Sequence, residues 1–265
     1  MGAELVALSK GVTNYIWTID TKYWNKTSPI LFPIVGRLKN DTYHYEGNQY
    51  ALSRHGFARD NEFKIVHQTA TEVVFSFSSN STTLRVYPFA FELQIGYTLK
   101  ENKLIISYQV CNNNEVEMPF SIGAHPAFAI DGNFSDYTLV FDSNDNFESH
   151  LLENDLFSGK TKVIPSKDNM IPLNYDLFST DALVFKKLKS SEITLVNKNK
   201  PVLKMNFKGF PYLGIWTKEK APFLCIEPWF GHADNENSNG KLMEKDGIQI
   251  IKPNALFHCQ FSIEI

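Results

Sequence analysis

The chain has 265 residues, of which 43% are apolar and 14% aromatic, so it can form a sizeable hydrophobic core and does not resemble a disordered protein. Its 26 basic and 29 acidic residues give a net charge of −3 without any basic block, which argues against binding to nucleic acid or to an anionic membrane surface. We find no signal peptide and no apolar run of membrane-spanning length, and therefore expect a cytoplasmic protein.

Alternation of apolar and polar residues is the dominant pattern along the chain. It runs through Val73 to Ser78 and through Phe91 to Leu99, and it resumes at Leu104 to Val110 after the polar turn 100–103. The last residues, Phe257 to Ile265, repeat it. A period of two is typical of strands with one buried face, and the two segments around the polar turn predict a hairpin.

The remaining segments show little helical character. We expect short helices only around Asp181 to Leu188 and near Ser238 to Glu244, and the polar segment from Asp142 to Lys167 is predicted to be a loop at the rim of a sheet. No repeat or linker divides the chain. The sequence therefore predicts an all-β protein, a large antiparallel β-sandwich formed as a single domain over residues 1–265.

The three cysteines, Cys111, Cys225 and Cys259, form neither a CxxC motif nor a metal-ligand pattern. Cys225 and Cys259 stand in apolar, strand-like stretches. We expect both to be buried free thiols.

Arginines and a histidine interrupt the first apolar, glycine-rich region. Arg37 follows an uncharged run and can either bind two oxygens of a ligand or take part in a structural ion pair. Arg59 has the same two interpretations, with the adjacent Asp60 favouring the ion pair. His55 precedes Gly56, which permits close approach of a ligand to the backbone.

Two further polar residues stand in apolar surroundings. His125 precedes Pro126 and has small neighbours, so it is either a proton-transfer group or a satisfied core histidine. Glu227 ends an uncharged run on a predicted central strand. A carboxylate there costs several kcal/mol unless it is paired or protonated, which suits either a general base or a buried ion pair.

Two weaker candidates complete the set of predicted site residues. Trp229 offers a flat face on which a sugar ring can stack, although a tryptophan is also common in a core. Asp181 can bind a ligand or cap a short helix.

These segments together resemble the aldose 1-epimerase family, also called galactose mutarotases, and within it the lactose-operon-associated LacX-like branch. Four motifs carry the resemblance, and their order and spacing span most of the chain from about Asn14: FPIVGR at 32–37, HGFAR at 55–59, GAHPAF at 123–128 and IEPW at 226–229.

The resemblance implies a sugar bound in an open cleft, with no metal and no cofactor. By it, Glu227 matches the catalytic base, His125 the catalytic acid and His55 a second histidine near the ring oxygen. Arg37 matches the sugar-binding arginine, and Asp181 matches less distinctly the aspartate that holds ring hydroxyls. The partner expected is a small-molecule sugar, either an aldohexose or its 6-phosphate.

Three alternatives to a mutarotase of free hexoses stay open at this point. The HGFAR motif also occurs in related hexose-6-phosphate mutarotases, and Arg37, Arg54 and Arg59 can supply a phosphate grip. A non-catalytic sugar-binding or sensing protein can have the same fold. A glycoside hydrolase can use Glu227 and Asp181 as its carboxylate pair, although it does not need the histidines.

Overall fold

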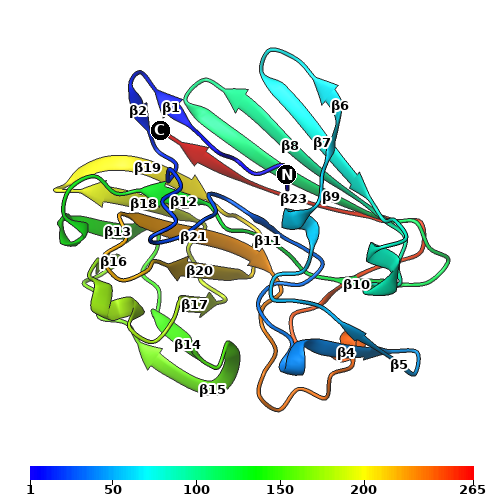
Figure 1. Cartoon of the computed structure of the whole chain (residues 1–265). Helices are drawn as coiled ribbons and strands as arrows, with labels where there is room; N and C mark the ends of the chain where they lie inside the picture. The colour runs from blue at the N-terminus through cyan, green and yellow to red at the C-terminus, as the bar shows by residue number, and fades with distance from the viewer.

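The computed structural model describes residues 1–265 and contains no α-helix. Its largest element is a nine-stranded antiparallel sheet, which extends from the upper right to the left side of Figure 1. In spatial order its strands are β16 (Met170–Pro172), β13 (Tyr137–Phe141), β18 (Glu192–Asn197), β19 (Lys200–Asn206), β23 (Leu256–Glu264), β9 (Lys103–Asn112), β8 (Phe91–Lys100), β7 (Glu72–Ser78) and β6 (Lys64–Gln68).

A six-stranded antiparallel sheet crosses the middle of Figure 1. Its order is β17 (Leu183–Lys186), β20 (Tyr212–Trp216), β21 (Phe223–Phe230), β11 (Ile122–Ala124) and β3 (Ile30–Leu31), and β12 (Ala127–Ala129) also pairs with β21. A cluster of 52 buried residues, with side chains from both sheets, forms the main core. The antiparallel sandwich predicted from the sequence is confirmed.

Four two-stranded ribbons complete the strand content. They are β1 (Ser9–Lys10) with β2 (Thr13–Asn14), β4 (Thr42–Tyr45) with β5 (Asn48–Ala51), β10 (Met118–Phe120) with β22 (Gln249–Ile251), and β14 (Glu148–Glu153) with β15 (Leu156–Val163). The connections contain six short 3₁₀ turns: η1 (Lys39–Asp41), η2 (Ala58–Asp60), η3 (Thr83–Arg85), η4 (Phe134–Asp136), η5 (Tyr175–Phe178) and η6 (Leu242–Glu244). None of these turns has the length or the apolar character needed to cross a bilayer.

The strands predicted from alternation are confirmed. The segments 73–78, 91–99 and 104–110 fall within β7, β8 and β9, and 257–265 coincides with β23 except for its last residue. Strand β8 pairs with β9 as the predicted hairpin. Both Cys225 and Cys259 are buried free thiols, as expected.

Two local predictions are wrong. The expected helix at 181–188 is instead strand β17, which pairs with β20 and is short, apolar and buried, so its periodicity does not distinguish strand from helix. The expected loop at 142–167 contains the β14–β15 hairpin, whose turn residues Asn154 and Asp155 both have positive φ. Near 238–244 the only helical turn is η6.

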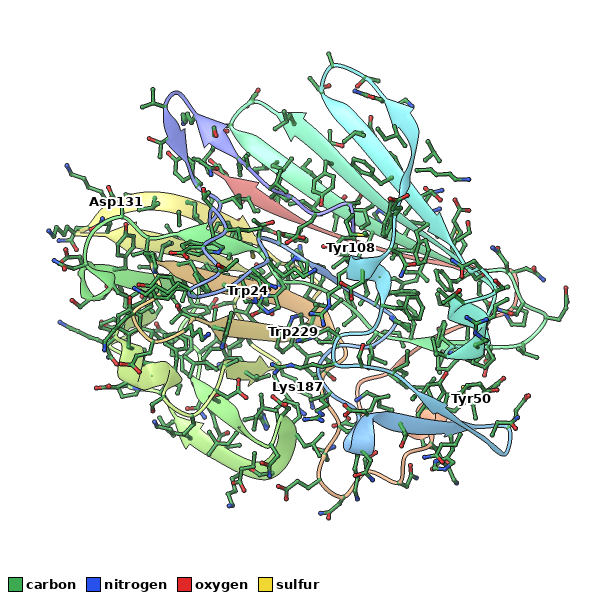
Figure 2. The ribbon with its side chains drawn as sticks, in the orientation of Figure 1. Trp24, Tyr50, Tyr108, Asp131, Lys187 and Trp229 are labelled. Atoms are coloured by element: carbon green, nitrogen blue, oxygen red, sulfur yellow. The ribbon has the colours of Figure 1, made fainter.

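Strand β21 contributes side chains to both faces of the smaller sheet. Leu224 and Ile226 belong to the main core, whereas Cys225, Glu227 and Trp229 project to the opposite face because side chains alternate along a strand. Figure 2 shows Trp229 and Trp24 near the middle of the molecule, at this face. This face is the floor of the candidate site.

Candidate active site

A cavity of about 330 Å³ opens over this face of the smaller sheet. Segments that are far apart in the sequence line it: the N-terminal region, the β14–β15 hairpin, β17, β20 and β21. The lining residues are Tyr23, Trp24, Gly36, Arg54, His55, Arg59, His125, Leu152, Asp155, Phe157, Ala182, Val184, Trp216, Lys218, Glu227, Trp229 and Ala233. Five of the seven predicted site residues are among them.

Glu227 lies at the floor of the cavity on β21, where it is flanked by β20 on one side and by β11 and β12 on the other. Its side chain is 2% exposed, and its Oε2 atom is buried without a hydrogen-bond partner. Burial raises the pKa of Glu227 well above its ordinary value, and the nearby charge of Arg54 opposes that rise. The prediction of a carboxyl group on a central strand is confirmed.

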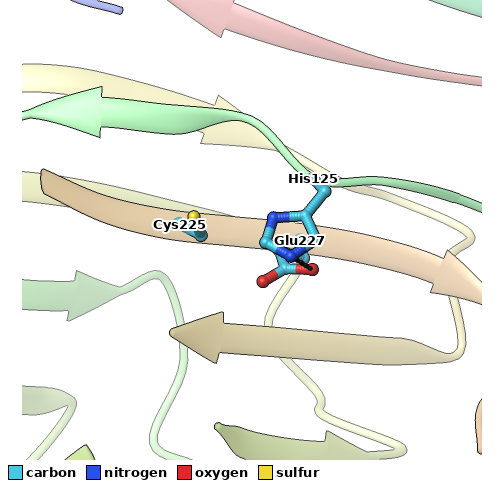
Figure 3. A group of neighbouring side chains, drawn as sticks. All are labelled: His125, Cys225 and Glu227. Atoms are coloured by element: carbon cyan, nitrogen blue, oxygen red, sulfur yellow. Dashed lines mark ion pairs between the residues drawn. The ribbon is translucent and has the colours of Figure 1, made fainter. Parts of the chain in front are cut away.

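His125 follows directly after β11 and places its imidazole against Glu227. Its Nε2 atom lies 3.4 Å from Oε2 of Glu227 (Figure 3). The ring of Trp24 stacks on the imidazole with 4.9 Å between ring centroids. Burial, together with the nearby charge of Arg54, lowers the pKa of His125 to about 3. The two groups therefore form a buried carboxyl–imidazole pair that lines the cavity.

His55 lies beside this pair, with its ring centroid 5.9 Å from that of His125. The backbone N–H of Gly36 donates to Nδ1 of His55 at 3.1 Å, and Nε of Arg54 lies 3.2 Å from Nε2. Burial lowers the pKa of His55 well below its ordinary value, so the ring is neutral and accepts at only one nitrogen. The N–H of Gly36 is fixed in the backbone and donates to the one accepting nitrogen, Nδ1. The Nε–H of Arg54 is therefore available to donate to an oxygen of a ligand.

Arg37 does not line the cavity and instead faces a shallow neighbouring pocket. Its guanidinium donates to both carboxylate oxygens of Asp41, at 2.8 and 2.7 Å, and to Asp155 at 3.2 Å. Asp155 also accepts from Arg54 at 2.8 Å. Of the two interpretations left open for Arg37, these contacts correspond to the ion pair.

Arg59 and Asp181 lie at the edge of the site. Arg59 lines the cavity, donates to the carbonyl oxygen of Arg54 at 2.9 Å and has Asp60 at 3.7 Å. The carboxylate of Asp181 accepts from the backbone N–H of Ala182 at 2.7 Å, just before β17, and does not cap a helix. Burial raises the pKa of Asp181, and its charge in turn raises that of Glu227.

Trp229 packs closely against the smaller sheet. A Cβ atom at Gly123 or Gly214 would overlap its indole ring, so these glycines provide the room in which it lies. Its side chain is 7% exposed, and its Nε1–H group is buried without an acceptor. The proximity of this N–H group lowers the pKa of Glu227. The indole therefore contacts the candidate base from within the sheet.

The sequence reasoning missed several lining residues, above all an aromatic wall and an acidic group. Trp24 and Trp216 lie around His125, with Trp216 edge-on at 5.7 Å, and Asp155 stands at the tip of the β14–β15 hairpin. Trp24 lies in a segment without periodicity, and Asp155 falls in the polar stretch interpreted as a loop, so neither carried a signal.

Comparison with known proteins identifies the family of this chain. A sequence model of the aldose 1-epimerase family matches residues 1–246. The plasmid-encoded protein LacX of Lactococcus lactis is 33% identical, over 96% of this chain and 90% of its own. A galactose mutarotase related enzyme of Lactobacillus acidophilus is 33% identical with a TM-score of 0.94, covering 99% of this chain and 91% of its own.

A galactose mutarotase-like protein of Lactobacillus casei is similarly close, at 30% identity and a TM-score of 0.92 over 99% of this chain and 94% of its own. An all-β sandwich with a buried glutamate–histidine pair in a cavity, together with these matches, defines an isomerase of the mutarotase type. The chain belongs to the aldose 1-epimerase family. The predicted resemblance and enzyme class are confirmed.

Proposed function

We propose that the enzyme interconverts the α and β anomers of an unphosphorylated hexose, with Glu227 as general base and His125 as general acid. The observation that carries this proposal is the buried pair, 3.4 Å apart at the floor of the cavity. The cavity, at about 330 Å³, falls within the range usual for small-molecule sites, about 300–1,000 Å³.

Mutarotation requires one proton to leave the anomeric hydroxyl and one to reach the ring oxygen. The C1–O5 bond then breaks, the aldehyde end rotates, and the ring closes from the other face with both proton transfers reversed. The two oxygens are bonded to the same carbon, so an acid and a base in mutual contact can serve both. Each positioned proton-transfer group contributes about 10²–10⁴-fold to the rate.

The proton inventory of the pair supports this role. Burial raises the pKa of Glu227 and lowers that of His125, so burial favours a pair that holds one proton between its two members. That proton on Glu227 gives a neutral pair, and transfer to His125 gives the carboxylate and imidazolium that the proposed roles require. Either form has one proton to donate and one lone pair to accept with.

The remaining polar groups can hold the sugar. We assign His55 to the ring-oxygen side of His125, where it assists or positions the acid. Arg54, Arg59 and Asp181 are available around the edge for distal hydroxyls, and Trp229 offers an apolar face. Arg37 is assigned an indirect part, since it holds Asp155, which in turn contacts Arg54.

A hexose 6-phosphate is the second candidate substrate, and one feature favours it: the Nε atom of Arg59 is buried without an acceptor. The pairing of the other two arginines supports the free sugar, because Asp155 already accepts from both Arg37 and Arg54. A phosphate bound there would have to displace that carboxylate.

The test is NMR exchange spectroscopy of the anomers of galactose, glucose and glucose 6-phosphate with the wild-type enzyme. We expect faster exchange of at least one free sugar and little acceleration of the phosphate ester. Preferential acceleration of glucose 6-phosphate would replace the free-sugar proposal with its phosphorylated counterpart. Exchange at the buffer rate for every sugar would contradict both.

A further inference from the structure

Cys225 lies close to the catalytic pair without lining the cavity. One ligand atom from each of His125, Cys225 and Glu227 lies within 4.8 Å of the other two, and all three residues are buried (Figure 3). Cys225 and Glu227 are two positions apart on β21 and so project to the same face of the strand. We propose that these three residues form a binding site for a thiophilic divalent cation such as Zn²⁺, and that the bound metal excludes the sugar.

The donor set fits such an ion. A thiolate, an imidazole nitrogen and a carboxylate oxygen are the three kinds of zinc ligand in proteins, and three protein ligands with one open position are typical of accessible zinc sites. Zinc bonds of about 2.0–2.3 Å place two ligand atoms roughly 3.4–3.7 Å apart, so a small closing movement of side chains from the present spacing suffices.

Two orphaned atoms also point to a ligand. Nδ1 of His125 and Oε2 of Glu227 are both buried without a hydrogen-bond partner. A metal in this position would have access from the cavity, which His125 and Glu227 line, and would meet the Cys225 thiol behind them. The open cavity would supply water as the fourth ligand.

The charge balance allows the site to form. Thiol and carboxyl groups release their protons to water as the metal binds, and the resulting two negative charges neutralise the dication. This offsets the repulsion from the nearby Arg54 guanidinium, whose charge acts on both His125 and Glu227. A bound metal would occupy the lone pairs that proton transfer needs, so its effect on catalysis rests on the proposed function, whereas its binding does not.

Cobalt(II) is the direct probe, because a cobalt–thiolate bond gives a charge-transfer absorption band in the near ultraviolet. We expect this band in the wild type and in Cys259→Ala, whose thiol is buried on β23 in the other sheet, but not in Cys225→Ala. Cys225→Ser, which conserves volume, is the second variant if the alanine protein folds poorly. A band that persists without Cys225, or is missing from the wild type, overturns the proposal.

Inhibition provides the second readout. Zn²⁺ should slow anomer exchange by the wild type, and a chelator should restore the rate. In Cys225→Ala the Zn²⁺ concentration for half inhibition should rise roughly 100-fold or more, because loss of even an outer partner of a metal ligand lowers metal affinity about 10–100-fold. Without metal, Cys225→Ala should keep its exchange activity. Equal sensitivity of both proteins to Zn²⁺ would contradict the site. If no protein catalyses exchange, the cobalt spectrum still decides the metal site.

Discussion

The carboxyl group of Glu227 has one basic partner within 4 Å, the imidazole of His125. Both side chains are buried, and burial disfavours the charged form of each. In the proposed mechanism the pair holds one proton and can place it on either member. Three predictions at the scale of the residue depend on this property.

The first concerns stability. The folded-state pKa of Glu227 lies above its unfolded value of about 4.5, so the folded protein loses stability as pH rises from about 4.5 toward the folded pKa. Glu227→Gln removes this loss. We expect the variant to be about 1 kcal/mol more stable than the wild type at neutral pH and nearly equal to it at pH 4. Urea unfolding at both pH values measures the difference, and equal stability at neutral pH would contradict a raised pKa.

The second concerns the pH dependence of kcat/KM, which reports the free enzyme. Because burial lowers the pKa of His125 to about 3, the pair keeps a single proton throughout the mildly acidic range. We expect a flat profile from neutral pH down to about pH 4, and a fall on the alkaline side as the pair loses its proton. An acid limb centred near pH 6.5, as for an ordinary histidine, would show that the imidazole is not buried as described.

The third concerns Trp229, whose N–H lowers the pKa of Glu227. Trp229→Phe keeps an aromatic ring over the glycines and removes this donor. We expect the alkaline limb of kcat/KM to move to higher pH, because Glu227 then releases its proton less readily. A limb at the wild-type position, with only KM changed, would indicate stacking on the sugar and no effect on the base.

At the scale of the element, the β14–β15 hairpin forms one wall of the cavity and is attached by its tip. Asp155, in the turn, accepts from Arg54, which also lines the cavity, and from Arg37, which lies outside it. All three side chains are partly exposed, between 29% and 47%, so solvent screens the pairs and they add little stability. Their effect is on the charge presented to the substrate.

We therefore predict that Asp155→Asn changes specificity more than stability. With Arg54 and Arg37 released, kcat/KM for glucose 6-phosphate should rise about tenfold relative to that for glucose, the equivalent of about 1.4 kcal/mol. Glu153→Gln is the matched control, because Glu153 lies on the same hairpin but pairs with Lys160. An unchanged ratio of the two substrates in Asp155→Asn would exclude this role.

How well the elements could be predicted depended on their surroundings. Strands β8, β9 and β23 alternate because one face is in the core and the other is more exposed, so the pattern identifies them. Strand β17 is almost wholly buried and lacks alternation. The hairpin at 148–163 is polar because much of it faces solvent, and its turn contains Asn154 and Asp155 in place of glycine.

The same reasoning explains which site residues could be predicted. Glu227 and His125 are polar residues in apolar runs, so their burial was implied by the sequence. Trp24 and Asp155 stand in polar segments that show no strand or helix pattern, so the sequence does not indicate their position. They become part of the site only when the chain folds. Arg37 was noticed for a good reason, its uncharged context, but tertiary contacts with Asp41 and Asp155 direct it away from the cavity.

At the scale of the whole molecule, the antiparallel sandwich assembles a site from widely separated segments. His55, His125 and Glu227 belong to three regions of the chain, and the smaller sheet joins them through the pairing of β11 with β21 and the contact of residues 32 and 56. The larger sheet covers the opposite face and completes the core. The smaller sheet thus carries the site on one face, and its other face packs against the larger sheet in the core.

The most direct test of the central claim is the anomer exchange rate of galactose and glucose with wild type and Glu227→Gln, measured by NMR together with sugar binding. We predict rapid exchange by the wild type, and in the variant a loss of at least about 10²-fold, the usual contribution of one general base, with binding retained. A variant that exchanges anomers as fast as the wild type would contradict the assignment of Glu227 as the base.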